Sequence, residues 1–185
     1  MTAAADRDVM AEDVVDVLLT QHALIEEQFR AVAAASRKPE RRAAFEELAR
    51  LLVVHETLEQ EIVHPEAGDD AGVEVVAERL AEEQRADEVL AELFEIEVND
   101  ADFPRLLQGL KESVLSHATR EERYEFPHLR HAGPPERLVA LGVALREGFE
   151  AAPARLPRNG DAEEALASVR EQVRAAIRPT PGGNA

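Results

Sequence analysis

The chain has 185 residues, with 21 Lys and Arg against 38 Asp and Glu, and a formal net charge of −17. This charge argues against nucleic acid as a partner, because the electrostatic term would be repulsive over most of the surface. The absence of cysteine excludes disulfides, iron–sulfur clusters and thiolate zinc sites. The sequence also has no apolar run long enough to span a membrane and no secretory signal at its start, so we expect a cytoplasmic protein.

The first helix is predicted from about residue 11 to residue 35. Its apolar stripe, at steps of three and four, consists of Val15, Leu18, His22, Ile25 and Phe29. His22 therefore lies in the middle of a row that should face the core. Pro39 follows a break in the pattern and suits the first turn of the next helix.

The second helix is predicted over residues 40–63. Its stripe contains Phe45, Leu48, Leu52, His55, Glu59 and Ile62. His55 and Glu59 are four residues apart and share one helical face, and burying both without partners would cost several kcal/mol. Pro65 is predicted to end this helix and to open a loop over residues 65–72.

The third helix is predicted over residues 73–98. One seam of it contains Val76, Leu80, Glu83, Asp87, Leu90 and Phe94, with Gln84 on its flank. Residues 99–102 should end this helix. Asp102 is predicted to cap the fourth helix, with Pro104 in its first turn.

The fourth helix is predicted over residues 104–125, ending before Pro127. Its stripe is Leu110, Val114, His117, Glu121 and Tyr124. His117 and Glu121 repeat the spacing of His55 and Glu59, with a proline at the same offset. Tyr124, one turn beyond Glu121, is predicted to lie on the same inward face.

The remaining residues, 136–177, contain two weaker helical stretches separated by Pro153, Pro157 and Gly160. The sequence therefore predicts an all-α fold, an up-down-up-down four-helix bundle with an additional C-terminal helical segment. We expect the bundle over residues 1–132, an extension packing on it over residues 133–178, and a disordered tail over residues 179–185.

Three histidines and two carboxylates in one core indicate a metal site, because without partners they would destabilise the bundle. Imidazole and carboxylate ligands together suit iron, manganese or zinc, and carboxylates that bridge two ions favour a dinuclear iron or manganese centre. A lone core histidine is more often a hydrogen-bonded structural residue. Glu122 and Glu125 are expected to be solvated.

The pattern His22, His55/Glu59 and His117/Glu121, with the ending Glu59-Gln60-Glu61-Ile62-Val63-His64-Pro65, resembles the bacterial hemerythrin-like, or HHE cation-binding, family over about residues 14–130. The resemblance implies a four-helix bundle holding two oxo- or hydroxo-bridged iron ions, with manganese or zinc less favoured. Such a site binds or reduces O2, peroxide or nitric oxide, or senses iron or oxygen. Tyr124 is predicted to donate a hydrogen bond to a bound oxygen species or to ligate iron itself. By position, the terminal nitrogen ligands would be His22, His55 and His117, the bridging or chelating carboxylates Glu59 and Glu121, and a weaker candidate ligand Glu56.

The sequence departs from the family pattern on the third helix, where Gln84 stands at the position usually held by histidine. Either Glu83 turns inward, or one iron is short of a nitrogen ligand. In the second case Gln84 is a weak ligand, or the position is vacant and filled by water. A site with more carboxylates and fewer imidazoles favours the ferric state, and hence chemistry on peroxide or nitric oxide over reversible O2 carriage. Two alternatives stay open: an iron- or oxygen-sensing or iron-donating module with a protein partner, and a structural bundle with buried ion pairs.

Overall fold

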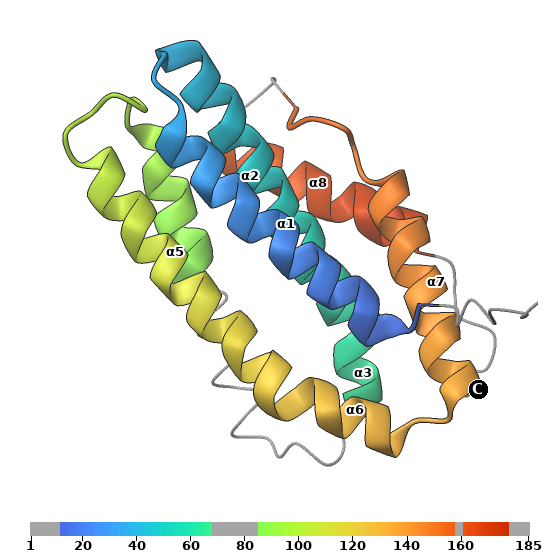
Figure 1. Cartoon of the computed structure of the whole chain (residues 1–185). Coiled ribbons are helices and arrows are strands. Elements are labelled where there is room, and N and C mark those ends of the chain that lie inside the picture. The colour runs from blue at the N-terminus through green and yellow to red at the C-terminus, as the bar shows by residue number, and fades with distance from the viewer. Residues whose placement is uncertain (1–11, 68–84, 158–160, 178–185) are drawn as a thin grey trace, which may run out of the picture.

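The computed structural model describes residues 12–67, 85–157 and 161–177, and within these ranges the regular structure is helical, without strands. The bundle consists of α1 (Val14–Ala34), α2 (Lys38–Leu58), the helical residues 85–95 and α5 (Phe103–Arg120). Figure 1 shows α5 continuing into α6 (Phe126–Ala132) along one side. On the other side lie α7 (Pro135–Ala151) and α8 (Ala162–Ala176). The predicted all-α fold is confirmed.

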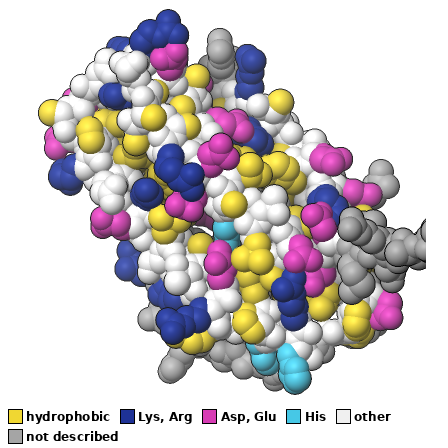
Figure 2. Space-filling model, in the orientation of Figure 1, with side chains coloured by type: hydrophobic (Ala, Val, Ile, Leu, Met, Phe, Trp, Pro, Cys, Tyr) yellow, Lys and Arg dark blue, Asp and Glu magenta, His cyan; other side chains and the backbone are white. Residues whose placement is uncertain are grey.

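Charged side chains of both signs are spread over the visible face of the molecule (Figure 2). Among the described helices, none combines the length and the apolar character needed to cross a membrane.

Local sequence signals mark the starts of α1 and α2, and one of the two signals predicted for α5 is present, since Pro104 lies in its first turn. α1 begins with a capping box, in which Asp13 and Asp16 each accept a hydrogen bond from the other's backbone N–H. α2 has proline in its first turn, as predicted. The predicted cap of α5 is wrong: Asp102 precedes the helix, but its helical backbone (φ −83°, ψ −20°) does not aim the carboxylate at the first N–H groups.

The prediction that proline ends the second and fourth helices is also wrong, because in both places the polypeptide stays helical past the proline. α2 is followed by a π-helical turn, η1 (Glu59–Val63), and by α3 (His64–Ala67), which contains Pro65. α5 is followed by a π-helical turn, η2 (Glu121–Glu125), and by α6, which has Pro127 in its first turn.

The π turns explain how the prolines are accommodated. The N–H of His64 bonds to the carbonyl of Glu59, and that of Phe126 to the carbonyl of Glu121, each five residues back. Regular α-helical bonding therefore stops before each proline. The proline then falls in the first turn of a new helix, where its missing N–H has no intrahelical partner to lose.

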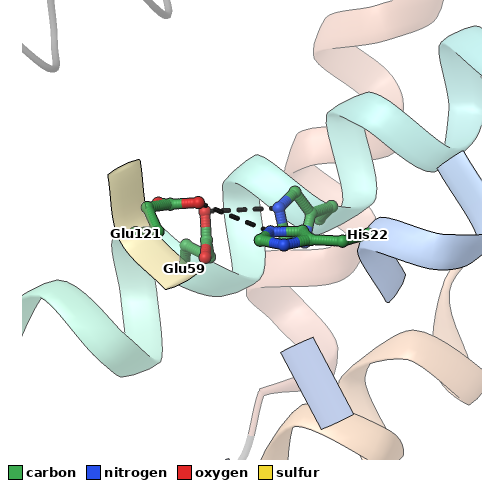
Figure 3. Close-up of side chains that lie close together, drawn as sticks. His22, Glu59 and Glu121 are labelled. Carbon is green, nitrogen blue, oxygen red and sulfur yellow. Dashed lines mark ion pairs between the residues drawn. The ribbon is translucent and has the colours of Figure 1, made fainter. Parts of the chain in front are cut away.

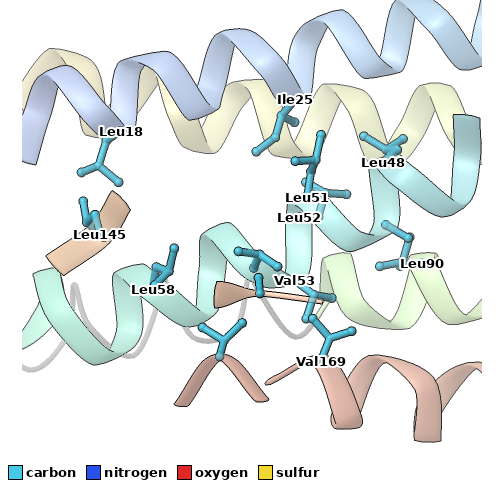
Figure 4. Close-up of a cluster of buried hydrophobic side chains, with 14 of the residues drawn as sticks. Leu18, Ile25, Leu48, Leu51, Leu52, Val53, Leu58, Leu90, Leu145 and Val169 are labelled. Atoms are coloured by element: carbon cyan, nitrogen blue, oxygen red, sulfur yellow. The ribbon is translucent and has the colours of Figure 1, made fainter. Parts of the chain in front are cut away.

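The core is built around α2, which is enclosed on more than one side. Four consecutive residues of α2 are buried, Leu51, Leu52, Val53 and Val54. α1 packs against α2, and so do α7 and α8. Figure 4 shows Leu145 of α7 and Val169 of α8 in the same buried cluster as side chains of α2. The C-terminal helices thus share the core of the bundle, and the division of the chain at residue 133 stays a prediction.

The helical residues 85–95 are held to their neighbours by an aromatic and an ionic contact. The ring of Phe94 lies 4.8 Å from that of Phe45 in α2. Arg170 of α8 donates to both carboxylate oxygens of Asp87 at 2.6 Å, while burial raises the pKa of Asp87 against the influence of Arg170. The preceding part of the predicted third helix, with Glu83 and Gln84, lies outside the described residues, as does the predicted tail 179–185.

Replacing Gly142 in α7 with alanine is expected to lower the free energy of unfolding by about 1–3 kcal/mol. A Cβ there would lie 2.8 Å from the carbonyl carbon of Asp13 and 2.9 Å from the carbonyl oxygen of Glu12, and backbone atoms cannot move aside as a flexible side chain would. Gly109→Ala in α5 is the matched control, since its Cβ meets nothing within 4 Å and alanine is the better helix former by roughly 1 kcal/mol. Urea denaturation compares the two. A Gly142→Ala protein as stable as wild type would contradict the close approach of α7 to the start of α1.

Candidate metal centre

Four side chains from four different segments meet in the core of the bundle. His22 comes from α1, His55 from α2, and Glu59 and Glu121 are the first residues of the two π turns. One ligand atom from each lies within 4.8 Å of the others. All four side chains are buried, and Figure 3 shows the carboxylates of Glu59 and Glu121 facing His22. We call these four residues the central cluster.

His117 lies at the edge of the central cluster and shares one of its carboxylates. Its Nε2 is 3.1 Å from Oε1 of Glu121, while Oε2 of Glu121 is 3.4 Å from Nε2 of His22. The His117 side chain is 19% exposed. A carboxylate with an imidazole at each oxygen is placed as a ligand that bridges two cations would be.

The tautomer of His55 follows from its hydrogen bond. Its Nδ1 lies 2.8 Å from Oε1 of Gln21, and because a carbonyl oxygen can only accept, Nδ1 carries the proton. Burial, reinforced by the neighbouring His22, lowers the pKa of His55 to about 3, so the ring is neutral at ordinary pH. Its Nε2 therefore presents a lone pair, which faces Oε2 of Glu59 at 3.4 Å.

His22 is held in the same way by a carboxylate. Its Nδ1 lies 2.8 Å from Oε1 of Glu122. Its Nε2 and the Oε2 of Glu121 are both buried and both lack a hydrogen-bond partner, although they are 3.4 Å apart. Burial would lower the pKa of His22, but Glu121 and Glu122 outweigh it and the pKa is raised.

These unsatisfied atoms fit a cation between them. Two buried polar atoms that face each other without a hydrogen bond recover only part of the cost of their desolvation. Nitrogen and oxygen ligands bind first-row metal ions at about 2.0–2.2 Å, which places two ligands of one ion roughly 3.0–3.4 Å apart. The distance between Nε2 of His22 and Oε2 of Glu121 is 3.4 Å. The residues of the central cluster therefore fit a metal ion.

Glu121 is in the ionised form that metal ligation requires. Burial by itself would raise the pKa of its carboxyl group, but the imidazoles of His117 and His22 outweigh burial and hold that pKa below its usual value. The carboxylate can therefore bind a cation without first losing a proton.

A small cavity adjoins the central cluster. Its volume is about 40 Å³, and its polar lining includes the three predicted histidine ligands together with Glu56 and Glu59. The rest of the described lining is mainly apolar: Ile25, Leu52, Ala86, Val114, Leu115 and Ala118. A space of this size holds roughly one to three water-sized molecules. Figure 2 shows a small histidine surface near the middle of one face, between acidic and hydrophobic side chains.

The structure brings together His22, His55, Glu59, His117 and Glu121, and places Glu56 in the cavity wall. Ligation by each of them stays a prediction. Glu83 and Gln84 lie outside the described residues.

Tyr124 does not face the central cluster, so its predicted position is wrong. Its side chain is 65% exposed and its ring lies near the guanidinium of Arg123. The reason is η2, because in a π turn the residue five places after Glu121 takes the position that an α-helix would give to the residue three or four places after it. That residue is Phe126, which is buried and stacks on His22 with ring centroids 5.6 Å apart.

Sequence reasoning missed both side chains that hold the outer nitrogens of the central histidines. Glu122 is exposed, as predicted, but it also accepts a hydrogen bond from Nδ1 of His22. Gln21 was not singled out at all, although a glutamine beside an inward-facing histidine is a signal that could have found it. For Glu122 no such signal existed, because α-helical periodicity places it on the surface.

Comparison with known proteins agrees with this geometry. Residues 13–129 match the family model described as the hemerythrin HHE cation binding domain. The solved structures include a similar one, a hemerythrin HHE cation binding domain-containing protein from Mycobacterium kansasii, with 22% identity and a TM-score of 0.65. The match covers 90% of this chain and 95% of that one. No match to a curated protein was found.

Proposed function

Because the chain belongs to the hemerythrin HHE cation-binding family, we propose that its histidines and carboxylates hold two iron ions that bind or turn over a small oxidant. Peroxide or nitric oxide is favoured over reversible carriage of O2. The observation that carries the proposal is the buried pair of atoms Nε2 of His22 and Oε2 of Glu121, which have no hydrogen-bond partner and fit a shared cation.

The donor atoms suit iron in more than one oxidation state. His22 and His55 offer imidazole nitrogen, and Glu59 and Glu121 offer carboxylate oxygen, the mixture found in di-iron carboxylate bundles. Bound iron supplies redox chemistry and an open coordination position. The protein supplies ligands whose proton states are already set, since His55 is neutral and Glu121 ionised.

The cavity supports a small substrate. A space of about 40 Å³ beside three histidines is large enough for a diatomic molecule or hydrogen peroxide. Its apolar wall limits the number of waters that compete for the same space. The preference for peroxide or nitric oxide rests on the sequence, where Gln84 replaces the histidine of the family pattern and leaves a more carboxylate-rich ligand set. A cytoplasmic location is part of the proposal, because nothing in the composition requires an oxidising compartment.

The second candidate is an iron-sensing or iron-donating module without turnover. The burial of four ionisable side chains in one cluster favours it, because their desolvation couples the stability of the fold to the presence of a cation. A change in metal occupancy would then be transmitted to a protein partner.

Purified protein, analysed for metal and then mixed with hydrogen peroxide or nitric oxide, separates the two functions. For the first we expect about two iron ions per chain, near-ultraviolet absorption of ferric iron, and consumption of the oxidant. Iron that is retained without reacting, in a protein whose melting temperature falls on chelation, supports the second. A protein that binds no metal and is fully stable would contradict both.

A further inference from the structure

Each histidine of the central cluster forms a hydrogen bond through Nδ1 to a side chain outside the cluster. The residue that accepts this bond is adjacent in sequence to another member of the cluster. Gln21 precedes His22 in α1 and accepts from Nδ1 of His55 in α2 at 2.8 Å. Glu122 follows Glu121 in η2 and accepts from Nδ1 of His22 at 2.8 Å. The Nδ1 atom of each imidazole, which points away from the cluster, is thus bound by a residue from another helix than the histidine's own.

We propose that Glu122 is a positioning residue, which fixes the tautomer and orientation of His22 and strengthens its Nε2 as a donor to a cation in the central cluster. Gln21 does the same for His55 with a neutral amide. The inference rests on the metal centre of the proposed function, but not on the reaction that occurs there.

The orientation of the His22 ring is defined by contacts on several sides. Glu122 accepts from one ring nitrogen, and Oε2 of Glu121 lies 3.4 Å from the other. Phe126 stacks on the ring at an interplanar angle of 23°, and the ring of His55 meets it edge-on at 76°. With the ring fixed in this way, Nε2 points at the position where a cation would bind.

The π turn is what allows two consecutive residues to reach one ring. In a regular α-helix, adjacent side chains point in different directions and do not face a common partner. In η2, Glu121 and Glu122 approach the two nitrogens of the same imidazole, and Phe126 covers its face. This gives the π turn a function in the site, beyond accommodating Pro127.

The two hydrogen-bond acceptors differ in charge. A carboxylate hydrogen-bonded to the outer nitrogen of a metal ligand raises the basicity of that ligand, whereas a neutral amide has a weaker effect. His22 is therefore the stronger of the two nitrogen donors, and a substitution at Glu122 acts on the metal through it. The Glu122 side chain is 43% exposed, so its replacement leaves no buried cavity.

Zinc binding to the metal-depleted full-length protein tests the proposal. Glu122→Ala is expected to weaken the Zn²⁺ affinity by about 10–100-fold, the usual effect of losing such a partner. Glu122→Gln, whose amide oxygen still accepts from Nδ1, should restore most of that loss. Glu26→Gln is the matched control, an exposed glutamate on α1 with a similar side-chain exposure of 45%, and its affinity should equal that of wild type.

Proton NMR of the zinc-loaded proteins shows whether the hydrogen bond from Nδ1 of His22 persists when the cation is bound. The Nδ1–H proton of His22 should be far downfield in wild type, less so in Glu122→Gln, and exchanged with water in Glu122→Ala. Metal-free Glu122→Ala should melt somewhat below wild type, because it loses the contact with the buried ring of His22, whereas Glu26→Gln should not. A Glu122→Ala protein that binds Zn²⁺ as tightly as Glu26→Gln would overturn the role of Glu122 but leave the metal centre standing. A wild type that binds no cation would overturn the metal centre and the inference with it.

Discussion

Replacing Glu121 with glutamine is expected to lower the affinity of the protein for iron or zinc by more than about a hundredfold. Loss of a residue that only supports a ligand costs about 10–100-fold, and Glu121 is placed to be a ligand itself. Its two oxygens lie 3.1 Å from His117 and 3.4 Å from His22, so one substitution affects both imidazoles. Glutamine keeps the shape of the side chain and removes only the charge, so the effect isolates the carboxylate.

The same substitution should remove the stabilisation that metal gives to the fold. A cation present at a thousand times its dissociation constant stabilises the native state by about 4 kcal/mol, which corresponds to roughly 8–16 °C in melting temperature for a chain of this size. We expect this rise in the wild type and in Glu112→Gln, an exposed control on α5. Glu121→Gln should show almost none of it. Equal metal content in Glu121→Gln and the control, measured by elemental analysis, would rule out ligation by Glu121.

The parts of the site that lie on regular helix, or at the first residue of a π turn, could be predicted from the sequence. The stripe of α1 around His22 is buried as its periodicity indicates, and His55 and Glu59 do lie four apart on an inward face. Here the spacing of side chains along an α-helix decides both burial and proximity. The family match over residues 13–129 confirms the assignment that these residues suggested.

The parts that lie beyond the first residue of a π turn could not be predicted in this way. One additional residue in the turn at Glu121 moves Tyr124 to the surface, brings Phe126 onto His22 and makes Glu122 a partner of the same ring. The spacing of residues along the sequence predicts which side of a helix a side chain lies on only while the number of residues per turn stays constant. The proline at a fixed offset after each His-x-x-x-Glu pair marks where that repeat changes, and not the end of the helix.

The sequence of α2 itself indicates that other helices cover it on all sides, although a search for a single apolar stripe does not show this. The run Leu51-Leu52-Val53-Val54 is apolar on every face of the helix, which is typical of a helix covered on all sides. Four helices in a simple bundle leave the outer face of each exposed. The C-terminal helices therefore have a structural task, since α7 and α8 cover α2.

Deleting residues 134–185 is expected to prevent the remaining chain from folding stably. The deleted helices bury six aliphatic side chains to 5% exposure or less: Leu138, Leu141, Leu145, Leu166, Val169 and Val173. At about 1.5–3 kcal/mol each, their burial amounts to roughly 9–18 kcal/mol before the entropy of ordering them is subtracted. That is comparable to the whole net stability of a typical domain, about 5–15 kcal/mol.

A point substitution tests the same contact in the full-length protein. Val169 of α8 is 0% exposed, and Val169→Asp places an unpaired charge against α2, which should cost several kcal/mol. Ala167→Asp, two residues away and exposed, makes the same chemical change in water and should have little effect. Circular dichroism during thermal unfolding compares both with the truncated chain. A truncated chain that unfolds cooperatively near the wild-type temperature would show that residues 1–133 are an independent domain, and the metal centre would then owe nothing to α7 and α8. Loss of cooperative unfolding in both the truncated chain and Val169→Asp would mean instead that the ligands on α2 are held in place from the far side of that helix.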